Sequence, residues 1–388
     1  MQLKTKKHIF RTWIEISKSA LVHNLRVFRE LVGPNVKIAC IVKANAYGHG
    51  LKEIVLILNN TETDWFGVDS LEEALEIRAL GINKPILVLG YTPLLKLGEA
   101  VENEISLTVY NKESLQKILS LKMEKKAKIH LKVETGLNRQ GQKADEILDL
   151  AKLIIKNKDF FELEGLSTHF ANIEDTLDSS FAFEQLKVFK ETIRLLKKNK
   201  INPPIKHCAA SAAALLYPET HFNMIRVGIS LYGLCPSKET QIALSLKKSR
   251  RKLSLKPVLT WKSVLAQIKT VDQGESVGYG RIWFAPRKSV IGIVPVGYYD
   301  GYDRKLSNNS RILINGQSAP VVGRVAMNMI MVDLTNLKKT KTKTETEVVL
   351  IGKNDENEIS ADEFARRIGT INYEVVSRIN PFLPRVVV

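Results

Sequence analysis

Apolar positions in the first two thirds of the chain fall into short runs separated by longer amphipathic stretches. Eight such runs lie near 36–42, 65–69, 86–89, 106–109, 129–133, 163–168, 205–208 and 223–226. Their length and composition predict buried strands, and the segments between them are mostly long enough for a helix. Roughly eight βα units follow, and they favour a TIM-type (β/α)8 barrel whose active site lies at the C-terminal ends of its strands.

Two of the intervening segments carry clear helical signals. Ser70 is followed three residues later by Glu73, which is a capping-box pattern at a helix start. The second segment repeats apolar residues at helical spacing, namely Phe181, Leu186, Phe189, Ile193 and Leu196. Both patterns support alternation of strand and helix through this part of the chain.

After about Lys252 the pattern changes to short alternating strands divided by Gly, Asp and Asn turns. Clear examples are 258–266, 290–294 and 329–334. Such a change of period along the chain predicts a second, mainly β domain.

The change of pattern defines the expected domain boundaries. We expect the barrel at 11–246, a basic linker at 247–252 and the β domain at 253–388. The first ten residues are expected to pair with the β domain rather than the barrel.

Composition agrees with a globular protein of two domains, because 388 residues with 44% hydrophobic content can bury a large core. Cys40, Cys208 and Cys235 are odd in number and lack CxxC spacing, which argues against a disulfide framework and against a metal site. No stretch approaches the roughly 20 apolar residues that span a bilayer, so no membrane partner is expected. We therefore expect a cytoplasmic protein.

The formal charge of +17 raises the question of nucleic-acid binding. The basic residues cluster at 197–200, 247–252 and 338–343, without interleaved aromatic residues. Such clusters are more typical of solvated helix ends and loops, so no nucleic-acid partner is expected.

Lys43 is the first candidate for chemistry, because it follows the apolar run 36–42 at the C-terminal end of a predicted strand. Burying an ammonium costs several kcal/mol unless it is paired or deprotonated, and a covalent imine with an aldehyde removes that cost. A solvated strand end is the alternative. The hydroxyl of Tyr47 and the small residues Gly48 and Gly50 favour a loop that holds an anionic cofactor.

Residues 41–50, IVKANAYGHG, resemble the pyridoxal-phosphate (PLP) lysine motif of the alanine racemases. The resemblance implies PLP as cofactor, Lys43 as its covalent attachment point and Tyr47 as a cofactor-binding residue. It extends along nearly the whole chain.

Residues 132–141, KVETGLNRQG, resemble the KxDTGMxRxG segment of that family, with Glu134 where the family usually has Asp. The match implies that Arg139 contacts the substrate carboxylate and the ring-hydroxyl side of PLP. Lys132 matches a lysine that is often carbamylated in the family, and carbamylation would turn this cation into an anion that can orient Arg139. An ordinary ion pair with nearby acids is the alternative for either residue.

Two further segments of the predicted barrel resemble cofactor contacts. In 164–171 the THF sequence implies that His169 stacks near the PLP ring, whereas a lone histidine is more often structural. Residues 207–213 resemble HxANSAA, which implies that Ser211 meets the phosphate, with an ordinary helix cap as the alternative. Ala210 stands where the family usually has Asn.

Residues 226–233, RVGISLYG, resemble the RxGxxLYG segment. The match implies that Arg226 faces the pyridine nitrogen and that backbone groups of Gly228 and Ile229 bind the phosphate. Because arginine stays protonated, it leaves that nitrogen unprotonated, which weakens the electron sink and disfavours side reactions such as transamination.

The predicted β domain carries the rest of the resemblance. Residues 274–280 imply that Tyr279 is the catalytic tyrosine, which as a base needs a stabilised phenolate. Residues 297–302 imply that Tyr298 lines the substrate entryway.

Two more segments complete the series. Residues 323–328 imply that Met327 contacts substrate, with Asn328 in place of the usual Asp. Residues 371–375 imply that Tyr373 reaches the phosphate, although an aromatic residue in a β domain is more often core.

The resemblance implies an isomerase that interconverts L-alanine and D-alanine and supplies D-alanine for peptidoglycan synthesis. Lys43 would handle the proton of the D-enantiomer and Tyr279 that of the L-enantiomer. Because the family takes Tyr279, Met327 and Tyr298 from the second subunit, a homodimer with shared active sites is expected.

Three alternatives remain: a racemase of broader specificity, a decarboxylase of basic amino acids with the same fold, and a non-catalytic PLP-binding protein. Decarboxylases generally pair the pyridine nitrogen with an acid, so Arg226 disfavours them. The non-catalytic protein has no β domain, so residues 253–388 weigh against it.

Overall fold

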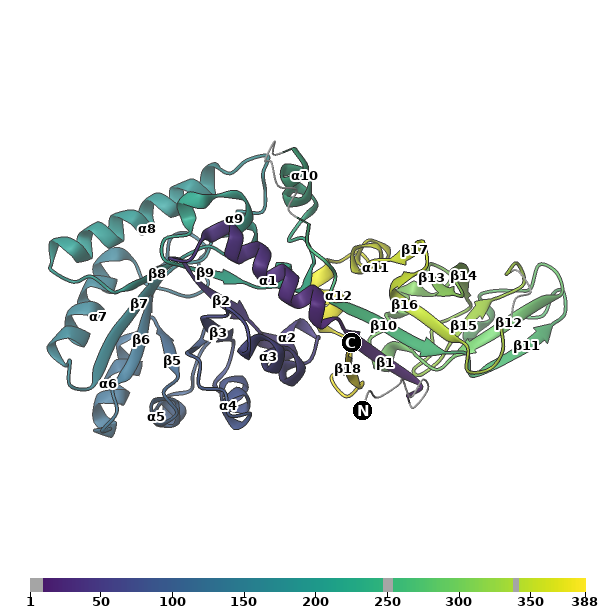
Figure 1. Cartoon of the computed structure of the whole chain (residues 1–388), viewed down its shortest axis with the longest axis horizontal. Helices are drawn as coiled ribbons and strands as arrows, with labels where there is room; N and C mark the ends of the chain where they lie inside the picture. The colour runs from purple at the N-terminus through teal and green to yellow at the C-terminus, as the bar shows by residue number, and fades with distance from the viewer. Residues whose placement is uncertain (1–9, 247–253, 338–341) are drawn as a thin grey trace. The chain divides into compact units, whose positions relative to one another are not determined.

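The computed structural model describes residues 10–246, 254–337 and 342–388, and the chain forms two compact units (Figure 1). The barrel unit comprises Ser19–Ala44 and Ile54–Lys256. Of the described residues, the β unit comprises those up to Lys18, Asn45–Glu53 and those between Pro257 and Val388.

The barrel unit is built on eight parallel strands: β2 (Lys37–Ile41), β3 (Trp65–Val68), β4 (Ile86–Val88), β5 (Ser106–Val109), β6 (Ala127–Lys132), β7 (Phe161–Ser167), β8 (Ile205–His207) and β9 (Met224–Val227). Their order is β8-β7-β6-β5-β4-β3-β2-β9, and every pair is parallel. Near the two ends of this order, the amide of Arg226 donates to the carbonyl of Ala209 at 2.9 Å. The result is a nearly closed barrel, and all eight predicted strands are confirmed.

Helices follow the strands: α1 (Lys18–Val32), α2 (Lys43–Tyr47), α3 (Leu51–Asn59), α4 (Leu71–Ala79), α5 (Leu97–Glu102), α6 (Lys112–Leu121), α7 (Ala144–Lys156), α8 (Ser180–Lys198), α9 (Ser211–Leu216) and α10 (Lys238–Leu246). The predicted cap of α4 is present, because Ser70 accepts a hydrogen bond from the amide of Glu73 at 3.3 Å. In α8, Leu186 and Phe189 are buried as predicted, but Phe181 is 40% exposed. Among the described residues, no helix combines the length and apolar content needed to cross a membrane.

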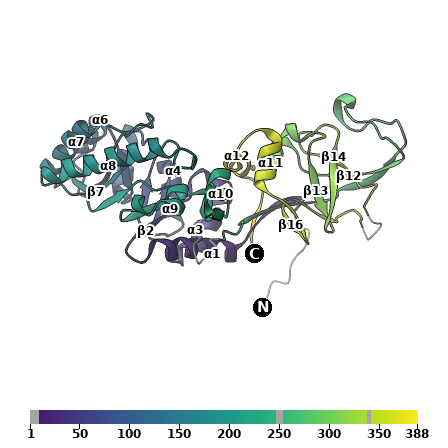
Figure 2. The same cartoon turned by 90° about the horizontal axis from the view of Figure 1, so that it is seen from above.

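The β unit contains β1 (Thr12–Ile16), β10 (Leu259–Val264), β11 (Gln267–Val271), β12 (Ser289–Val294), β13 (Arg311–Ile314), β14 (Gln317–Val322), β15 (Ile330–Asp333), β16 (Glu347–Asn354), β17 (Asn357–Ile359) and β18 (Arg385–Val387). The sheet order is β11-β12-β15-β14-β13-β16-β10-β1-β18, with β17 paired to β16. The helices α11 (Ala361–Ile368) and α12 (Asn372–Ser377) lie side by side (Figure 2). The predicted fold class, a barrel with a mainly β second domain, is confirmed.

Each of the two units is built from more than one segment of the chain. β1 pairs antiparallel with β10 and parallel with β18, so it belongs to the β sheet. Residues 45–53 also group with the β unit, although the predicted barrel of 11–246 contained both segments. The predicted linker 247–252 and residues 1–9 lie outside the described part of the chain.

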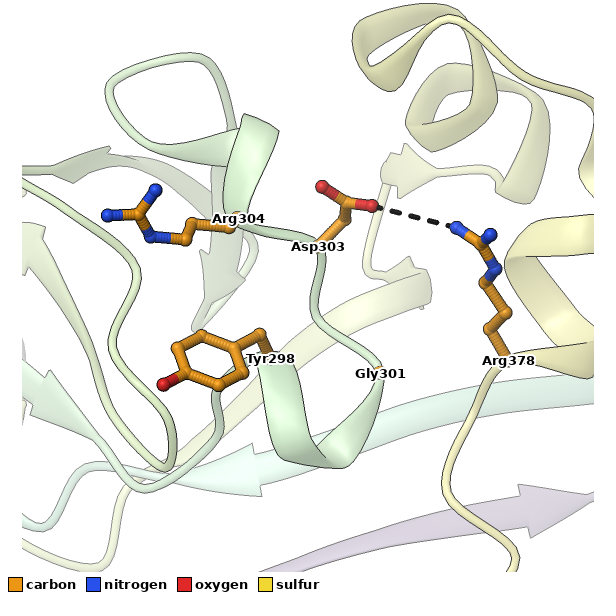
Figure 3. A pocket seen from close by; sticks show the side chains of 5 residues that line it. All are labelled: Tyr298, Gly301, Asp303, Arg304 and Arg378. Atoms are coloured by element: carbon orange, nitrogen blue, oxygen red, sulfur yellow. Dashed lines mark ion pairs between the residues drawn. The ribbon is translucent and has the colours of Figure 1, made fainter.

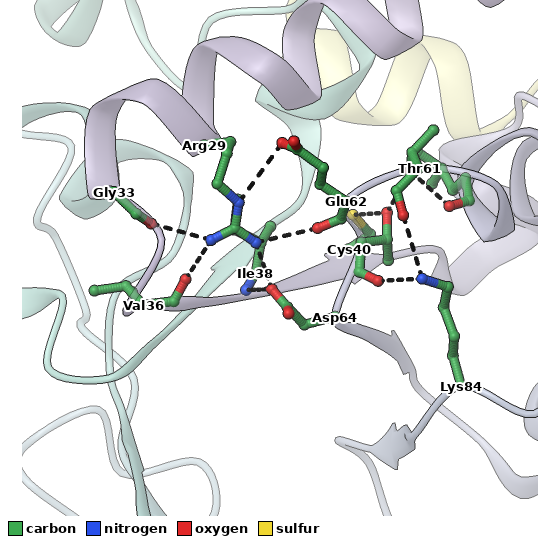
Figure 4. Close-up of polar contacts among 11 residues, drawn as sticks. Arg29, Gly33, Val36, Ile38, Cys40, Thr61, Glu62, Asp64 and Lys84 are labelled. Carbon is green, nitrogen blue, oxygen red and sulfur yellow. Dashed lines mark hydrogen bonds and ion pairs between the residues drawn. The ribbon is translucent and has the colours of Figure 1, made fainter.

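A cluster of polar contacts holds the N-terminal end of β2 (Figure 4). Arg29 of α1 donates to the carbonyl oxygens of Gly33 at 3.1 Å and Val36 at 2.7 Å. Its guanidinium also pairs with Asp64 at 2.5 Å, and Asp64 accepts a hydrogen bond from the amide of Ile38 at 2.8 Å. Contacts at the N-terminal end of a barrel strand serve stability, and here they hold the strand that ends at Lys43.

Candidate active site

Lys43 follows β2 directly and therefore stands at the C-terminal end of the barrel strands. Its Nζ pairs with Oδ1 of Asp69 at 3.0 Å, and its side chain is 38% exposed. Asp69 follows β3, the strand next to β2. The lysine is thus neither deeply buried nor isolated, and no sequence pattern indicated this carboxylate partner.

The backbone after Lys43 is left-handed over Ala44, Asn45, Ala46 and Tyr47, whose φ angles are 53, 54, 52 and 53 degrees. Left-handed backbone costs an L-residue about 1–2 kcal/mol, so these residues store on the order of 4–8 kcal/mol. Asn45 compensates in part, because its carbonyl accepts from the amide of Gly50 at 3.0 Å and its Oδ1 from the amide of Leu51 at 2.7 Å. Strain of this kind is concentrated at functional sites.

Glu73 fixes the start of this turn from the barrel side. Its Oε1 accepts a hydrogen bond from the amide of Ala44 at 2.6 Å, and its Oε2 accepts from the amide of Asp69 at 2.8 Å. One carboxylate therefore holds both the residue after Lys43 and the residue that pairs with it. The sequence predicted Glu73 only as a capping-box residue.

Arg226 of β9 is a buried cation, with 5% of its surface exposed. It donates to the carbonyl oxygens of Thr168 at 2.9 Å and Cys208 at 3.0 Å, and to Nδ1 of His207 at 2.6 Å. In the described part of the chain, none of its hydrogen-bond partners is a carboxylate. Burial lowers the pKa of Arg226 to about 10, which still leaves the guanidinium charged at neutral pH.

His169 lies beside this cation, with its Nδ1 at 3.2 Å from a guanidinium nitrogen of Arg226. Burial, followed by the charges of Arg226, Lys132, Arg139 and Lys43, holds the pKa of His169 well below its ordinary value. The imidazole is therefore neutral at physiological pH. Arg226 and His169, two of the predicted site residues, are thus in direct contact.

Lys132 ends β6 within this positive region. Burial, then the charges of Arg226 and Arg139, hold the pKa of Lys132 well below its ordinary value, against the opposing effect of Glu134. A neutral amine is nucleophilic, and CO₂ adds to amines in that form. The environment is thus chemically suited to carbamylation of Lys132.

Ser211 is the first residue of α9, and its Oγ accepts from the amide of Gly228 at 3.0 Å and from that of Ser230 at 3.4 Å. It does not cap α9, because the N-cap position is Ala210. A hydroxyl and the backbone amides of the turn after β9, where Ile229 is also buried, therefore gather at one place. Such a cluster suits a phosphate, and Ser230 is a member that the sequence did not indicate.

In the β unit, Tyr47 and Tyr373 of α12 face each other with ring centroids 6.1 Å apart. The neighbouring Gly48 has a φ of 81 degrees, and a Cβ there would collide with the carbonyl of Val376. Arg385 donates to the carbonyl of Gly48 at 2.8 Å. The segment after Lys43 is therefore locked to α12, and two predicted phosphate contacts lie together.

Tyr279 stands in the loop between β11 and β12 and is 72% exposed. A small apolar cluster that includes Val277 and Met331 supports this loop, and the Arg324 side chain lies against Gly280. The side chain of Tyr279 is thus exposed on a loop that packs against this apolar cluster.

Tyr298 lines a cavity of about 520 Å³ in the β unit, together with Gly301, Asp303, Arg304 and Arg378 (Figure 3). Asp303 and Arg378 form an ion pair at 4.0 Å, whereas the side chains of Tyr298 and Arg304 point away from that pair.

Met327 is exposed in the neighbouring loop. Its carbonyl accepts a hydrogen bond from the amide of Tyr299 at 3.0 Å, and the carbonyl of Ala326 accepts one from the amide of Tyr298 at 3.1 Å. These backbone bonds hold the loops of Tyr298 and Met327 together.

The residues fit an aldehyde cofactor that carries a phosphate and a basic ring nitrogen. A lysine amine stands at a strand end, a hydroxyl and backbone amides form an anion cradle, and a buried guanidinium is paired with neutral acceptors. The fold and this donor set define a two-part enzyme with its site on a (β/α)8 barrel. Within the described ranges, no group of three or more His, Cys, Asp or Glu residues could hold a metal ion.

Comparison with known proteins agrees with this class. Residues 16–236 match the N-terminal domain of alanine racemase, and residues 258–387 match its C-terminal domain. The chain is 39% identical to an alanine racemase of Leptospira interrogans, over 98% of this chain and 97% of that protein. It is 38% identical to alanine racemase 1 of Caldanaerobacter subterraneus, over 97% and 94%.

Solved structures give the same result. The alanine racemase of Bacillus anthracis with bound L-Ala-P superposes with a TM-score of 0.89 at 33% identity, over 98% of this chain and 96% of that one. The alanine racemase of Clostridium difficile in complex with cycloserine gives 0.87 at 34% identity, over 98% and 96%. The chain therefore belongs to the alanine racemase family, and the predicted family and enzyme class are confirmed.

The strained turn after Lys43 gives a prediction of stability. Ala44→Gly should raise the free energy of unfolding by up to about 1 kcal/mol, because glycine adopts positive φ without the steric cost. The matched control Ala79→Gly, at an exposed position of the right-handed helix α4, should lower it by about 0.5–1 kcal/mol. Urea unfolding of both variants measures the difference. Equal losses in the two variants would show that the turn is not strained.

Proposed function

We propose that this protein racemises alanine, with PLP held on Lys43. One combined observation supports the proposal. The chain matches the family over both domains, and its barrel places a lysine at a strand end. The barrel also contains a buried arginine that has no carboxylate partner in the described part of the chain. When bound, PLP acidifies the Cα proton of an amino acid by withdrawing electrons from it.

The residues of this chain would hold that cofactor in four ways. Lys43 supplies the amine, Arg226 faces the ring nitrogen, and His169 lies beside the ring as a neutral imidazole. The phosphate is bound by residues that share hydroxyl or backbone N–H donors, namely Tyr47, Ser211, Gly228, Ile229 and Tyr373. The hydrogen bonds from Gly228 and Ser230 to Ser211 support this assignment.

Two groups would move the proton, one on each face of Cα. Nζ of Lys43 removes or returns it on the D side, and Oη of Tyr279 does so on the L side. Asp69 at 3.0 Å from Nζ orients the lysine when it is free. Because the two bases act on opposite faces, removal by one and return by the other inverts the configuration.

The remaining predicted residues bind substrate. Arg139, which is exposed, would hold the carboxylate, and a carbamylated Lys132 would orient that guanidinium. Met327 would contact the substrate, and Tyr298 would line its entryway. Two guanidinium groups on the cavity of Tyr298 suit attraction of an amino-acid carboxylate.

The active unit in this proposal is a homodimer, in which Tyr279, Met327 and Tyr298 come from the partner. The exposure of Tyr279 and Met327 in their own subunit supports a role toward another molecule. The product D-alanine would serve peptidoglycan synthesis in the cytoplasm. These assignments rest on the family resemblance.

The reaction and its substrate range are tested by incubating the protein and PLP with each enantiomer of alanine, serine and lysine. Chiral analysis should show alanine converted in both directions to a racemic mixture and the other two amino acids converted more slowly. Lys43→Ala serves as the inactive control. Comparable rates with serine or lysine would indicate a broad-specificity racemase, and release of CO₂ from lysine would contradict the proposal.

The two-base assignment predicts an asymmetric effect of Tyr279→Phe. Loss of the hydroxyl should slow exchange of the Cα hydrogen of L-alanine by about 10²–10⁴-fold, the range for removal of a general base, and that of D-alanine far less. Tyr299→Phe, at another exposed tyrosine of the β unit, is the control. Exchange of both enantiomers in deuterated buffer, followed by mass spectrometry, decides the question. Slight and equal effects would refute the scheme.

A further inference from the structure

A continuous chain of polar side chains runs through the interior of the barrel unit, from Arg226 of β9 through His207 of β8 and His130 of β6 to Glu164 of β7. The distances are 2.6 Å from Arg226 to Nδ1 of His207, 2.8 Å from Nε2 of His207 to Nδ1 of His130, and 3.1 Å from Nε2 of His130 to Oε2 of Glu164. Both imidazoles are fully buried. Three of the four members, all except Arg226, have no role in the reaction proposed above.

The positions of the protons in this chain follow from the chemistry of its ends. A guanidinium can only donate, so Nδ1 of His207 must accept and the proton of that ring is on Nε2. That proton is donated to Nδ1 of His130, which places the proton of His130 on Nε2, where it is donated to Glu164. If His130 were doubly protonated, Nε2 of His207 would also have to accept, and that ring would carry no proton at all. Only one arrangement of the ring protons is therefore compatible with all three hydrogen bonds.

Charges at the two ends agree with this arrangement. Burial raises the pKa of Glu164, but the hydrogen bonds that it accepts from the His130 ring and, at 2.6 Å, from the Ser106 hydroxyl outweigh burial and leave that pKa below its ordinary value. Burial and the charge of Arg226 hold the pKa of His207 well below its ordinary value. The chain thus has a cation at one end, an anion at the other and two neutral rings between them.

The surroundings shield Arg226 and both imidazoles from water, whereas the Glu164 side chain is 12% exposed. The ring of Trp65 packs edge-on against His130 with centroids 5.6 Å apart. In such a low-dielectric interior, aligned hydrogen bonds strengthen one another. A buried cation without a counter-ion is costly, and Glu164 supplies that counter-charge through the two imidazoles.

We propose that Glu164 is a remote positioning residue for Arg226: through His130 and His207 it fixes the direction in which the guanidinium donates and keeps it aimed at the cofactor ring. The effect on the cofactor ring rests on the proposed function, whereas the proton arrangement does not. Loss of the anion would leave the Nε2–H of His130 without its charged acceptor, so that ring would reorient, its bond to His207 would break and the guanidinium would have a less defined orientation.

The proton arrangement is tested first, in the unmodified protein without cofactor. Long-range ¹H–¹⁵N NMR of the ring nitrogens should show His130 and His207 both neutral, with the proton on Nε2, at neutral pH. A proton on Nδ1 of either ring, or a doubly protonated His130, would overturn the proposal. This result does not depend on whether the protein racemises alanine.

The consequence is tested with Glu164→Gln, which keeps the size of the side chain but removes its charge. Its NMR spectrum should show a mixture of tautomers for His130, because a neutral amide can either accept from Nε2 of that ring or donate to it. In the PLP-loaded protein, kcat should fall about 10–100-fold, with little change in KM and a shifted cofactor absorption band. The magnitude is that found when a hydrogen-bond partner supporting a ligand of a metal site is removed.

Ser106→Ala is the control, because it removes the other donor to Glu164 and leaves the chain intact, so the tautomers and kcat should stay close to those of the unmodified protein. Should Glu164→Gln fail to fold, Glu164→Asp replaces it, because the shorter side chain withdraws the carboxylate from Nε2 of His130 and should also yield mixed tautomers of that ring. Unchanged tautomers and kcat in the Glu164 variant would refute the positioning role. If the unmodified protein were inactive, the proposed function would fail while the proton arrangement stood on its own result.

Discussion

Burial of the Arg226 guanidinium is the interaction on which the barrel site depends. Burial of His169 and Lys132, followed by the charge of Arg226 and of the other cations in this region, holds the pKa of each group well below its ordinary value and keeps His169 neutral. A carboxylate beside Arg226 would cancel this field, but its partners in the described part of the chain are imidazoles and carbonyl oxygens. The same field favours bound anions and disfavours protonation of a ring nitrogen that faces it.

The second constraint is the left-handed turn that follows Lys43. Contacts at each end of the turn offset its backbone strain. Glu73 in the barrel unit accepts a hydrogen bond from the amide of Ala44, and Gly48 in the β unit packs against α12. Backbone geometry and the ion pair with Asp69 position Lys43. Tyr47, four residues later, lies beside Tyr373.

The strands were predictable because their apolar runs are short and regularly spaced, and the cap at Ser70 had a local sequence signal. The turn was not, because Ala44 to Tyr47 contain no glycine to indicate positive φ. Asp69 and the second role of Glu73 depend on loops that meet only in the folded barrel. His130 and Glu164 look like ordinary polar residues of strands, and only the closure of the sheet brings them into one chain with Arg226. Residues 45–53 were assigned to the barrel for a similar reason, since their contacts with α12 are more than 300 residues away in sequence.

The central claim is that a lysine of the barrel and a tyrosine of the partner's β unit act on one substrate. Mixing inactive Lys43→Ala and Tyr279→Phe proteins under conditions of subunit exchange tests it directly. Random exchange makes half of the dimers mixed, each with one intact site of two, so activity should rise to about a quarter of the native value. If mass spectrometry shows mixed dimers while activity stays at the level of the separate variants, the shared site is contradicted.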